Sequence, residues 1–247
     1  MESRFAAMHN TKLPPLFGRG EEIELLSRRW RHAAQGEGQV VMLAGEPGIG
    51  KSHIAFALDE QLQSELHVTL RYFCSAHHTN SALFPFISQL ERAAAFQRSD
   101  TPAEKLSKLD ALLAQSTHNA EHVAVLAHLL ALPADDRYPL QDLAPHKRKE
   151  KTLAALLAQL DGLAARQPVF IIFEDVHWID PTSLELLATI VEHVPQIDRI
   201  SGANVRFWHI ADIEQHLAVA IDGTAWWVLS AGTVIPIKNA FMRLPAG

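Results

Sequence analysis

The sequence predicts an α/β fold in which a mainly parallel sheet lies between two layers of helices. Three runs rich in apolar and β-branched residues have the length of strands, at residues 39–44, 67–74 and 168–173. The first and the third are apolar almost throughout, which indicates strands covered on both faces. Segments with the apolar spacing of helices separate the three runs. Strands that alternate with helices in this way are typical of a three-layer α/β sandwich.

The N-terminal part of the chain predicts one helix before the first strand. Within residues 21–34, the apolar side chains of Ile23, Leu26 and Trp30 fall on one helical face. Residues 1–15 lack such a pattern, and we expect them to form a flexible leader.

A glycine-rich motif follows the first strand. Its eight residues are Gly45, Glu46, Pro47, Gly48, Ile49, Gly50, Lys51 and Ser52. The spacing matches a phosphate-binding loop, in which the glycines let successive backbone amides point at the β-phosphate. Lys51 supplies charge to the β- and γ-phosphates, and the Ser52 hydroxyl suits Mg²⁺. Because helical spacing begins at once after Ser52, a helix N-terminus also faces the phosphates. The motif predicts a site for ATP and Mg²⁺.

A helical insertion is predicted at about residues 82–166, between the second and third strands. This part of the sequence is rich in alanine and leucine. Its breaks fall near residues 100–102, 133–139 and 145. Thr101 is followed by Pro102 and by Glu104, a pattern that predicts a capping box at the start of a helix.

Two carboxylates, Glu174 and Asp175, come directly after the third apolar run. A nucleotide hydrolase needs one acid beside its Mg²⁺ and another to polarise the attacking water. By position, Glu174 is the metal-side acid and Asp175 is the water-activating one. A shift of one residue in the end of the strand would exchange these roles. Together with Lys51, the two acids are the predicted catalytic residues.

Several stretches together resemble a known family. They are 45–52, Phe17-Gly18-Arg19 with Glu21-Glu22, 71–74 with 77–83, 136–139 and 173–181. Over about residues 16–194 the chain resembles the AAA+-type P-loop ATPase module of the signal-transduction ATPases (the STAND group). The likeness is greatest to the ATPase region attached to bacterial class III adenylate cyclases.

The resemblance implies further features of fold and site. Gly18 and Arg19 would lie close to the adenine. The family's sheet has five strands in the order 5-1-4-3-2, its fourth strand ends in a polar sensor residue, and a lid domain follows. The resemblance also implies a signalling role, in which the nucleotide state controls a protein partner or an attached output domain.

The last part of the chain, residues 197–247, does not resemble the family's fourth strand, fifth strand or lid. Residues 205–210 can form a strand, and residues 226–229 and 233–237 can pair as a β-hairpin. Three of the five tryptophans occur after position 200. We therefore expect a P-loop sandwich that is incomplete at its C-terminus. A truncated reading frame that continues into unrelated sequence is one explanation, and a natural shortened protein is the other.

These observations predict a leader at 1–15, an ATPase domain at 16–196 and an atypical tail at 197–247 that forms a hairpin or is poorly ordered. The expected function is Mg²⁺-dependent ATP hydrolysis, with weak turnover because the fourth strand would be missing, and with it the sensor residue, any arginine finger and the lid. One alternative is a nucleotide-gated switch that binds ATP and hardly hydrolyses it. Another is an ATPase that loads on DNA in the manner of replication initiators.

Composition excludes other classes of function. The net charge of −6 gives no general reason to bind nucleic acid. The single cysteine excludes an internal disulfide, and no apolar run is long enough for a signal peptide or a membrane span. We expect a cytoplasmic protein. His118 and His122 have a metal-ligand spacing but no third ligand nearby, and the basic run at 147–151 is expected to face solvent.

Overall fold

The computed structural model describes residues 17–46, 48–117, 119–133, 138 and 143–200, and five later strands. From residue 194 onward it describes the course of the backbone only.

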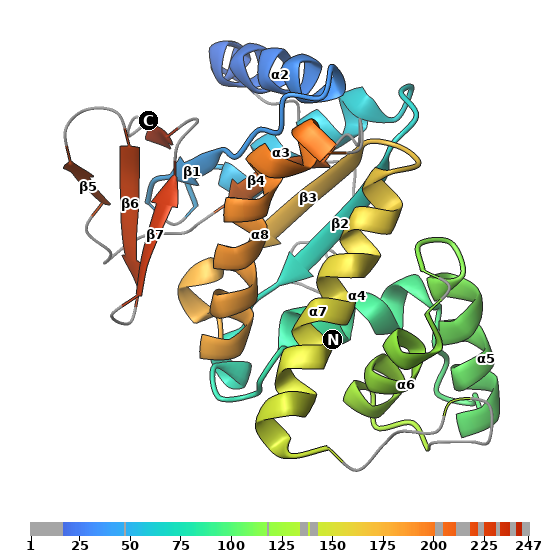
Figure 1. The fold of residues 1–247 in the computed structure, drawn as a ribbon. Coiled ribbons are helices and arrows are strands. Elements are labelled where there is room, and N and C mark those ends of the chain that lie inside the picture. The colour runs from blue at the N-terminus through green and yellow to red at the C-terminus, as the bar shows by residue number, and fades with distance from the viewer. Residues whose placement is uncertain are drawn as a thin grey trace.

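A five-stranded sheet forms the centre of the molecule (Figure 1). Its strands are β1 (Met42–Ala44), β2 (Val68–Phe73), β3 (Val169–Glu174), β4 (Val205–Ile210) and β8 (Phe241–Arg243). Their order is β2-β3-β4-β1-β8, and each neighbouring pair is parallel. The predicted parallel α/β architecture is confirmed.

One face of this sheet is covered by α2 (Gly20–Ala34) and α3 (Lys51–Leu62) (Figure 1). Trp30 of α2 packs against Phe170 of β3, with ring centroids 5.6 Å apart. Ile172, two residues along the same strand, belongs to the same buried cluster. Alternate residues of a strand point to the same face, so this cluster defines the α2–α3 side of the sheet.

The opposite face is covered by a larger helical layer. It comprises α4 (Phe84–Ala93), α7 (Pro145–Ala164) and α8 (Pro181–Ile200), and outside them α6 (Ala120–Leu129) packs on α7 and α5 (Pro102–Leu113) packs on α6. Ile171 and Phe173, the alternate residues of β3, are buried on this side. Phe173 stacks on Tyr72 of β2 with centroids 4.5 Å apart, and Tyr72 also contacts Phe86 of α4. The two helical layers complete the three-layer sandwich.

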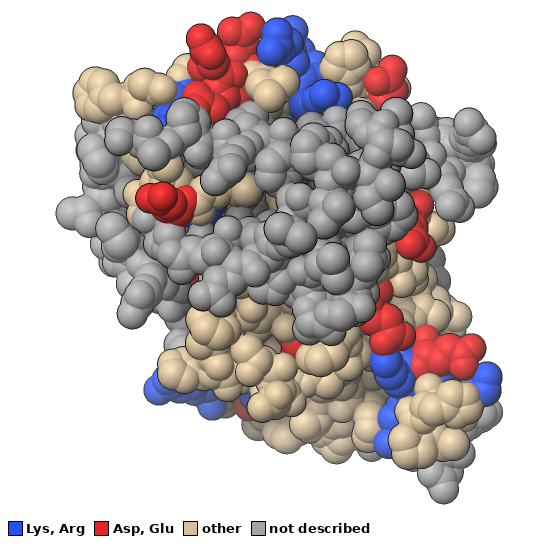
Figure 2. All heavy atoms as spheres, turned by 90° about the vertical axis from the view of Figure 1, so that its left-hand side faces the viewer, with Lys and Arg blue, Asp and Glu red and all other residues tan. Residues whose placement is uncertain are grey.

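Charged side chains of both signs are interspersed on the face shown in Figure 2, among the residues that are described. At the start of α7, the basic run contacts acids on its own and neighbouring helices. The ion pairs are Lys147–Glu150, Lys149–Glu185 and Lys151–Glu121. This basic run is therefore largely neutralised by its neighbours and does not form an open basic surface.

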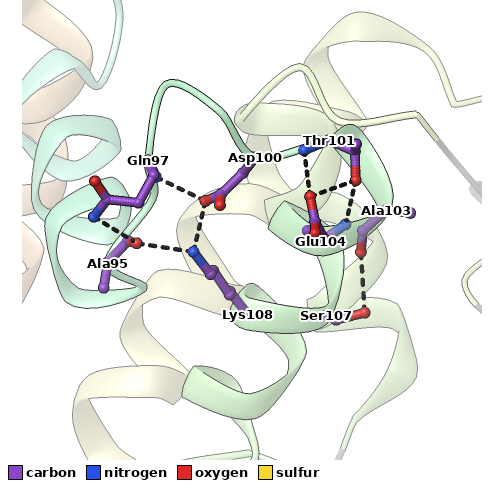
Figure 3. A network of polar contacts seen from close by, with 8 residues as sticks. All are labelled: Ala95, Gln97, Asp100, Thr101, Ala103, Glu104, Ser107 and Lys108. Carbon is purple, nitrogen blue, oxygen red and sulfur yellow. Dashed lines mark hydrogen bonds and ion pairs between the residues drawn. The ribbon is translucent and has the colours of Figure 1, made fainter.

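The segment between β2 and β3 is helical throughout its described part, as the sequence predicts. Its helix α5 begins with the predicted capping box (Figure 3). The Thr101 hydroxyl accepts from the Glu104 backbone N–H at 3.3 Å, and Glu104 accepts from the Thr101 N–H at 2.7 Å. Asp100, just before the box, forms an ion pair of 2.7 Å with Lys108.

The expectation that residues 197–247 do not supply the central strand is wrong. β4 lies between β1 and β3, and β8 pairs with the other edge of β1. With β8 in fifth place, the order is the 5-1-4-3-2 of the resembled family. Parallel pairing uses the N–H and C=O groups of an extended backbone and requires no particular motif, so a strand can be present where family motifs are not. The sheet thus crosses the domain boundary expected at residue 196.

A second, three-stranded sheet lies on the opposite side of the molecule from α5 and α6 (Figure 1). It consists of β5 (Ala218–Ile221), β6 (Ala225–Ser230) and β7 (Thr233–Ile237). Its pairings are antiparallel, and β6 and β7 contain the two runs proposed from sequence as a hairpin.

Gly162 of α7 lies against the chain that follows α5. A Cβ atom on Gly162 would stand 1.8 Å from the backbone oxygen of Ser116. We expect Gly162→Ala to lower the free energy of unfolding by about 3 kcal/mol, the upper range for overpacking, because backbone and not a flexible side chain must move. Urea denaturation would measure the loss. Gly20→Ala, where the added Cβ meets nothing within 4 Å, is the control. Equal stability of both variants would contradict the packing described.

Candidate active site

The phosphate-loop residues join β1 to the first turn of α3. Gly48 and Gly50 have φ angles of +79° and +98°, a region that residues with a Cβ seldom adopt. An added Cβ would meet nothing within 4 Å at either position. Both glycines are therefore required by the backbone turn and not by lack of space. Pro47 lies outside the described residues.

Lys51 extends back over this loop. Its Nζ donates to the backbone oxygens of Gly45 and Glu46, at 2.6 and 2.8 Å. The residue is only 6% exposed. A buried ammonium is thus held within the loop, beside the N-terminal turn of α3, where positive charge favours an anion.

Glu174 lies next to this turn because β3 ends beside α3. It is the last residue of β3, and its side chain has the same orientation as those of Phe170 and Ile172, toward α3. The Ser52 hydroxyl lies close enough to its carboxyl group to lower the pKa of that group. A hydroxyl and a carboxylate are both oxygen ligands of the kind that Mg²⁺ uses, so these two residues fit a magnesium site.

Burial raises the pKa of the Glu174 carboxyl above its ordinary value. The charge of Asp175 raises this pKa further, whereas the charge of Arg71 and hydrogen bonds from Ser52 and Arg71 lower it. The net shift is upward because the side chain is only 6% exposed. A metal ion beside Glu174 would favour its ionised form.

Arg71 and Asp59 lie at this site, although the sequence predicts no role for either residue there. Arg71 of β2 forms ion pairs with Glu174 at 3.3 Å and with Asp59 of α3 at 2.9 Å. Arg71 was recognised only as part of a family likeness. The available signal was a charged residue within a strand that is otherwise largely apolar, which needs a partner when it is covered.

Asp175 follows the strand with an unusual backbone conformation. Its φ and ψ angles are 56° and 41°, in the left-handed region, and it is exposed. Its backbone oxygen accepts from the Trp178 N–H at 2.9 Å, at the start of the turn η2 (Val176–Trp178). The turn directs the chain away from the sheet immediately after the buried Glu174. The two acids therefore have different surroundings, one buried beside Ser52 and the other open to solvent.

Asp180 connects the segment that leads into α8 with the segment that leads into α4, through hydrogen bonds to backbone N–H groups of both. Its Oδ1 accepts from the Thr182 and Ser183 N–H groups and so caps α8. The same atom accepts from the Leu83 N–H at 3.1 Å, 97 residues away in sequence. Leu83 itself has a left-handed backbone, with a φ of 59°, at the start of α4. Asp180 is 1% exposed, so these bonds are shielded from water.

We expect Asp180→Ala to lower the free energy of unfolding by about 2–4 kcal/mol. The variant loses an N-cap, which contributes about 0.5–2 kcal/mol, and leaves the Leu83 N–H unsatisfied, at about 1–3 kcal/mol. Thr101→Ala is the matched control, because it removes an N-cap without a second, distant donor (Figure 3). Chemical denaturation of the two variants would measure the difference. Equal losses would mean that the Leu83 bond adds no stability.

Gly18 and Arg19, expected near the adenine, lie at the start of α2. Gly18 has a φ of +69°, and Arg19 forms an ion pair with Glu22 at 3.0 Å. A cavity of about 480 Å³ opens between α2 and α3. It is lined by Arg19, Gly20, Ile23, Glu24, Ser27, Ala57 and Gln61. Gly18 is not among the lining residues.

The histidine pair considered for zinc gains no support from the described residues. His118 lies outside them, and His122 hydrogen-bonds to Thr117. Within the described part of the chain, no three His, Cys, Asp or Glu side chains are grouped so as to hold a metal ion. In the same part, none of the helices has the length and apolar character needed to cross a membrane.

Two solved structures resemble this fold at low sequence identity. Cdc6p from Pyrobaculum aerophilum aligns with a TM-score of 0.43 and 14% identity, over 83% of this chain and 41% of that one. The Walker-type ATPase of Pyrococcus abyssi aligns with a TM-score of 0.30 and 11% identity, over 80% and 45% of the two chains.

The sequence comparisons are more specific. A protein of Rhizobium meliloti (strain 1021) described as uncharacterized is 30% identical over 176 residues, which are 70% of this chain. The chain spans 17% of that relative's length. Residues 15–205 match the AAA ATPase domain family, a range that contains the phosphate loop, both acids and the helical insertion. The chain therefore belongs to the AAA ATPase domain family.

Proposed function

We propose that this protein binds ATP with Mg²⁺ and hydrolyses the bond between its β- and γ-phosphates. Water attacks the γ-phosphorus, the bond to the bridging oxygen breaks, and ADP and phosphate leave. The loop at 45–50 holds the phosphates, and Lys51 stabilises the charge on the β- and γ-phosphates. Ser52 and Glu174 would hold Mg²⁺, which neutralises the charge of the phosphate oxygens when it is bound.

The closeness of Ser52 to Glu174 is the observation that carries this proposal. The two residues are far apart in sequence and come from α3 and β3, yet the Ser52 hydroxyl lies near enough to the buried Glu174 carboxyl to lower its pKa, beside the phosphate loop. A loop that only turned the chain would not require a buried carboxylate next to its hydroxyl, since burial of such a group is unfavourable without a partner.

Asp175 is the proposed water-activating residue. It follows Glu174 directly, is exposed, and leaves the sheet in a left-handed conformation. Strained backbone of this kind supports a functional hypothesis when it occurs beside a binding site. Asp175 would accept a proton from the attacking water, and Glu174 would stay with the metal ion. The exchanged assignment is the alternative, and the phenotypes of Asp175→Asn and Glu174→Gln would separate the two.

The base of the nucleotide is proposed to lie beside Gly18 and Arg19. The cavity of about 480 Å³ next to Arg19 supports this placement, since it lies along α3, the helix that begins at the phosphate loop. The side chain of Arg19 is 13% exposed and is held by Glu22, so it would form a fixed wall of the base site.

The biological role is proposed to be that of a signalling ATPase module in the cytoplasm. The likeness to the ATPase regions of signalling proteins supports it. This chain matches only part of its longer Rhizobium relative. If this module were part of a larger signalling protein, its nucleotide state would control a protein partner or an output domain. The paired basic run of α7 gives no support to the DNA-loading alternative.

Titration of the purified protein with ATP, with and without Mg²⁺, tests the proposal when phosphate release is measured on the same sample. We expect saturable binding that Mg²⁺ strengthens, and phosphate release that saturates with ATP. Binding without phosphate release would favour the nucleotide-gated switch. Absence of binding would refute both. β4 occupies the central place in the sheet whose expected vacancy is one of the reasons for weak turnover, so the rate itself is part of the test.

A further inference from the structure

Arg71 of β2 lies between two carboxylates, that of Asp59 on α3 and that of Glu174 on β3. Its Nη2 is 2.9 Å from Asp59 Oδ2, and its Nη1 is 3.3 Å from Glu174 Oε1. The two acids use different nitrogens of one planar guanidinium, so both contacts can exist together. The shorter contact is with Asp59.

These contacts close a ring that begins and ends on α3. Ser52 and Asp59 are seven residues apart on this helix, which places them on the same face, about two turns apart. Ser52 lies beside Glu174 of β3, Glu174 forms an ion pair with Arg71 of β2, and Arg71 forms another with Asp59. The helix that carries the phosphate loop is thus joined to both neighbouring strands through charged groups.

Asp59 is held in a fixed orientation within this ring. Its Oδ1 accepts from the Thr69 hydroxyl at 2.9 Å, and its Oδ2 accepts from Arg71. Thr69 and Arg71 are two residues apart in β2 and point to the same face of the sheet. The Asp59 side chain is 21% exposed, and those of Arg71 and Glu174 are 20% and 6% exposed, so solvent screens the three charges only in part.

We propose that Asp59 is a positioning residue for the magnesium site, and that it acts through Arg71. This inference rests on the proposed function. The single positive charge of Arg71 interacts with both carboxylates, those of Asp59 and Glu174. If Asp59 were neutral, Arg71 would interact with Glu174 alone and compete with Mg²⁺ for the same carboxylate. The ring would also lose one negative charge. Both effects disfavour the metal ion, so Asp59 keeps Glu174 available to it.

The test is the Mg²⁺ concentration needed for half-maximal binding of a fluorescent ATP analogue. We expect Asp59→Asn to raise it about 10-fold, the lower range for loss of a group that supports a metal ligand. Affinity for the analogue in EDTA should stay unchanged. The matched control is Asp100→Asn, which loses an aspartate–lysine ion pair in the insertion (Figure 3) and should not change the Mg²⁺ requirement.

The route through Arg71 is tested by a double-mutant cycle. In an Arg71→Gln background, Asp59→Asn should change the Mg²⁺ requirement much less than in the parent, because no shared charge remains. An equal change in both backgrounds would overturn the route. If Asp59→Asn does not fold, Thr69→Val serves instead, since it frees Asp59 Oδ1 and should shift the requirement in the same direction.

The outcomes separate this inference from the proposed function. If the parent binds the analogue more tightly with Mg²⁺ and Asp59→Asn has the same Mg²⁺ requirement, the proposed function stands and the role of Asp59 is refuted. If Mg²⁺ does not affect binding by the parent, the magnesium site itself is refuted and the role of Asp59 with it.

Discussion

Lys51→Ala is expected to abolish ATP binding or to weaken it at least ~10-fold, while the protein remains folded. Charge-assisted hydrogen bonds to phosphate contribute about 1.5–3 kcal/mol, which corresponds to roughly a 10- to 150-fold change in affinity. The Lys51 ammonium already lies within the loop, bonded to Gly45 and Glu46, so little movement separates it from a bound phosphate. Calorimetric titration with Mg·ATP would measure the loss.

A lysine elsewhere provides the control for this prediction. Lys147 of α7 is exposed and forms an ion pair with Glu150 on the same helix, and Lys147→Ala should bind ATP as the parent does. Thermal unfolding of both variants should show that the Lys51 variant is folded. Equal ATP affinity for Lys51→Ala and the parent would exclude the loop from the nucleotide site.

The phosphate loop could be predicted from sequence because its chemistry is local. Eight consecutive residues supply the glycine turns, the lysine and the hydroxyl, and the structure shows Gly48 and Gly50 in the left-handed conformations that such a turn requires. The capping box at Thr101 is local in the same sense and is confirmed. The sheet's parallel nature also followed from the order of strands and helices along the chain.

The ring around Arg71 could not be predicted, since its contacts depend on the fold. Arg71 and Glu174 are 103 residues apart, and only the pairing of β2 with β3 brings them together. The bond from Leu83 to Asp180 spans 97 residues and has the same origin. No periodicity or motif within a short window contains such pairs, because the two partners of each pair come from distant parts of the sequence.

The central strand could not be predicted for a different reason. Residues 205–210 have the pattern of a strand, but the lack of family motifs after residue 197 gives no indication of a place in the sheet. Strand pairing uses backbone groups, and its position is set by the space between β1 and β3, which β4 fills. Sequence motifs identify residues that take part in chemistry. They say little about a strand whose side chains have no role in the site.

Substitution of Asp175 and substitution of Glu174 are expected to have different effects on ATP hydrolysis and on Mg²⁺-dependent binding. The loss of turnover in the Asp175 variant is the largest effect that we predict. Asp175→Asn should keep Mg·ATP binding and lose turnover by about 10²–10⁴-fold, the range for a general base. Glu174→Gln should instead weaken the Mg²⁺ dependence of binding, because its oxygens lie beside Ser52 at the proposed metal position. Steady-state phosphate release and ATP titrations at several Mg²⁺ concentrations would measure both.

The different surroundings of the two acids are the reason for this assignment. Glu174 is buried and held between Ser52 and Arg71, so a metal ion that it bound would be fixed relative to the phosphate loop. Asp175 is exposed beyond the end of the strand, where water can reach it. Asp100→Asn, far from the site, should change neither property. The opposite pattern would exchange the two roles, and unchanged turnover in both variants would remove both acids from catalysis.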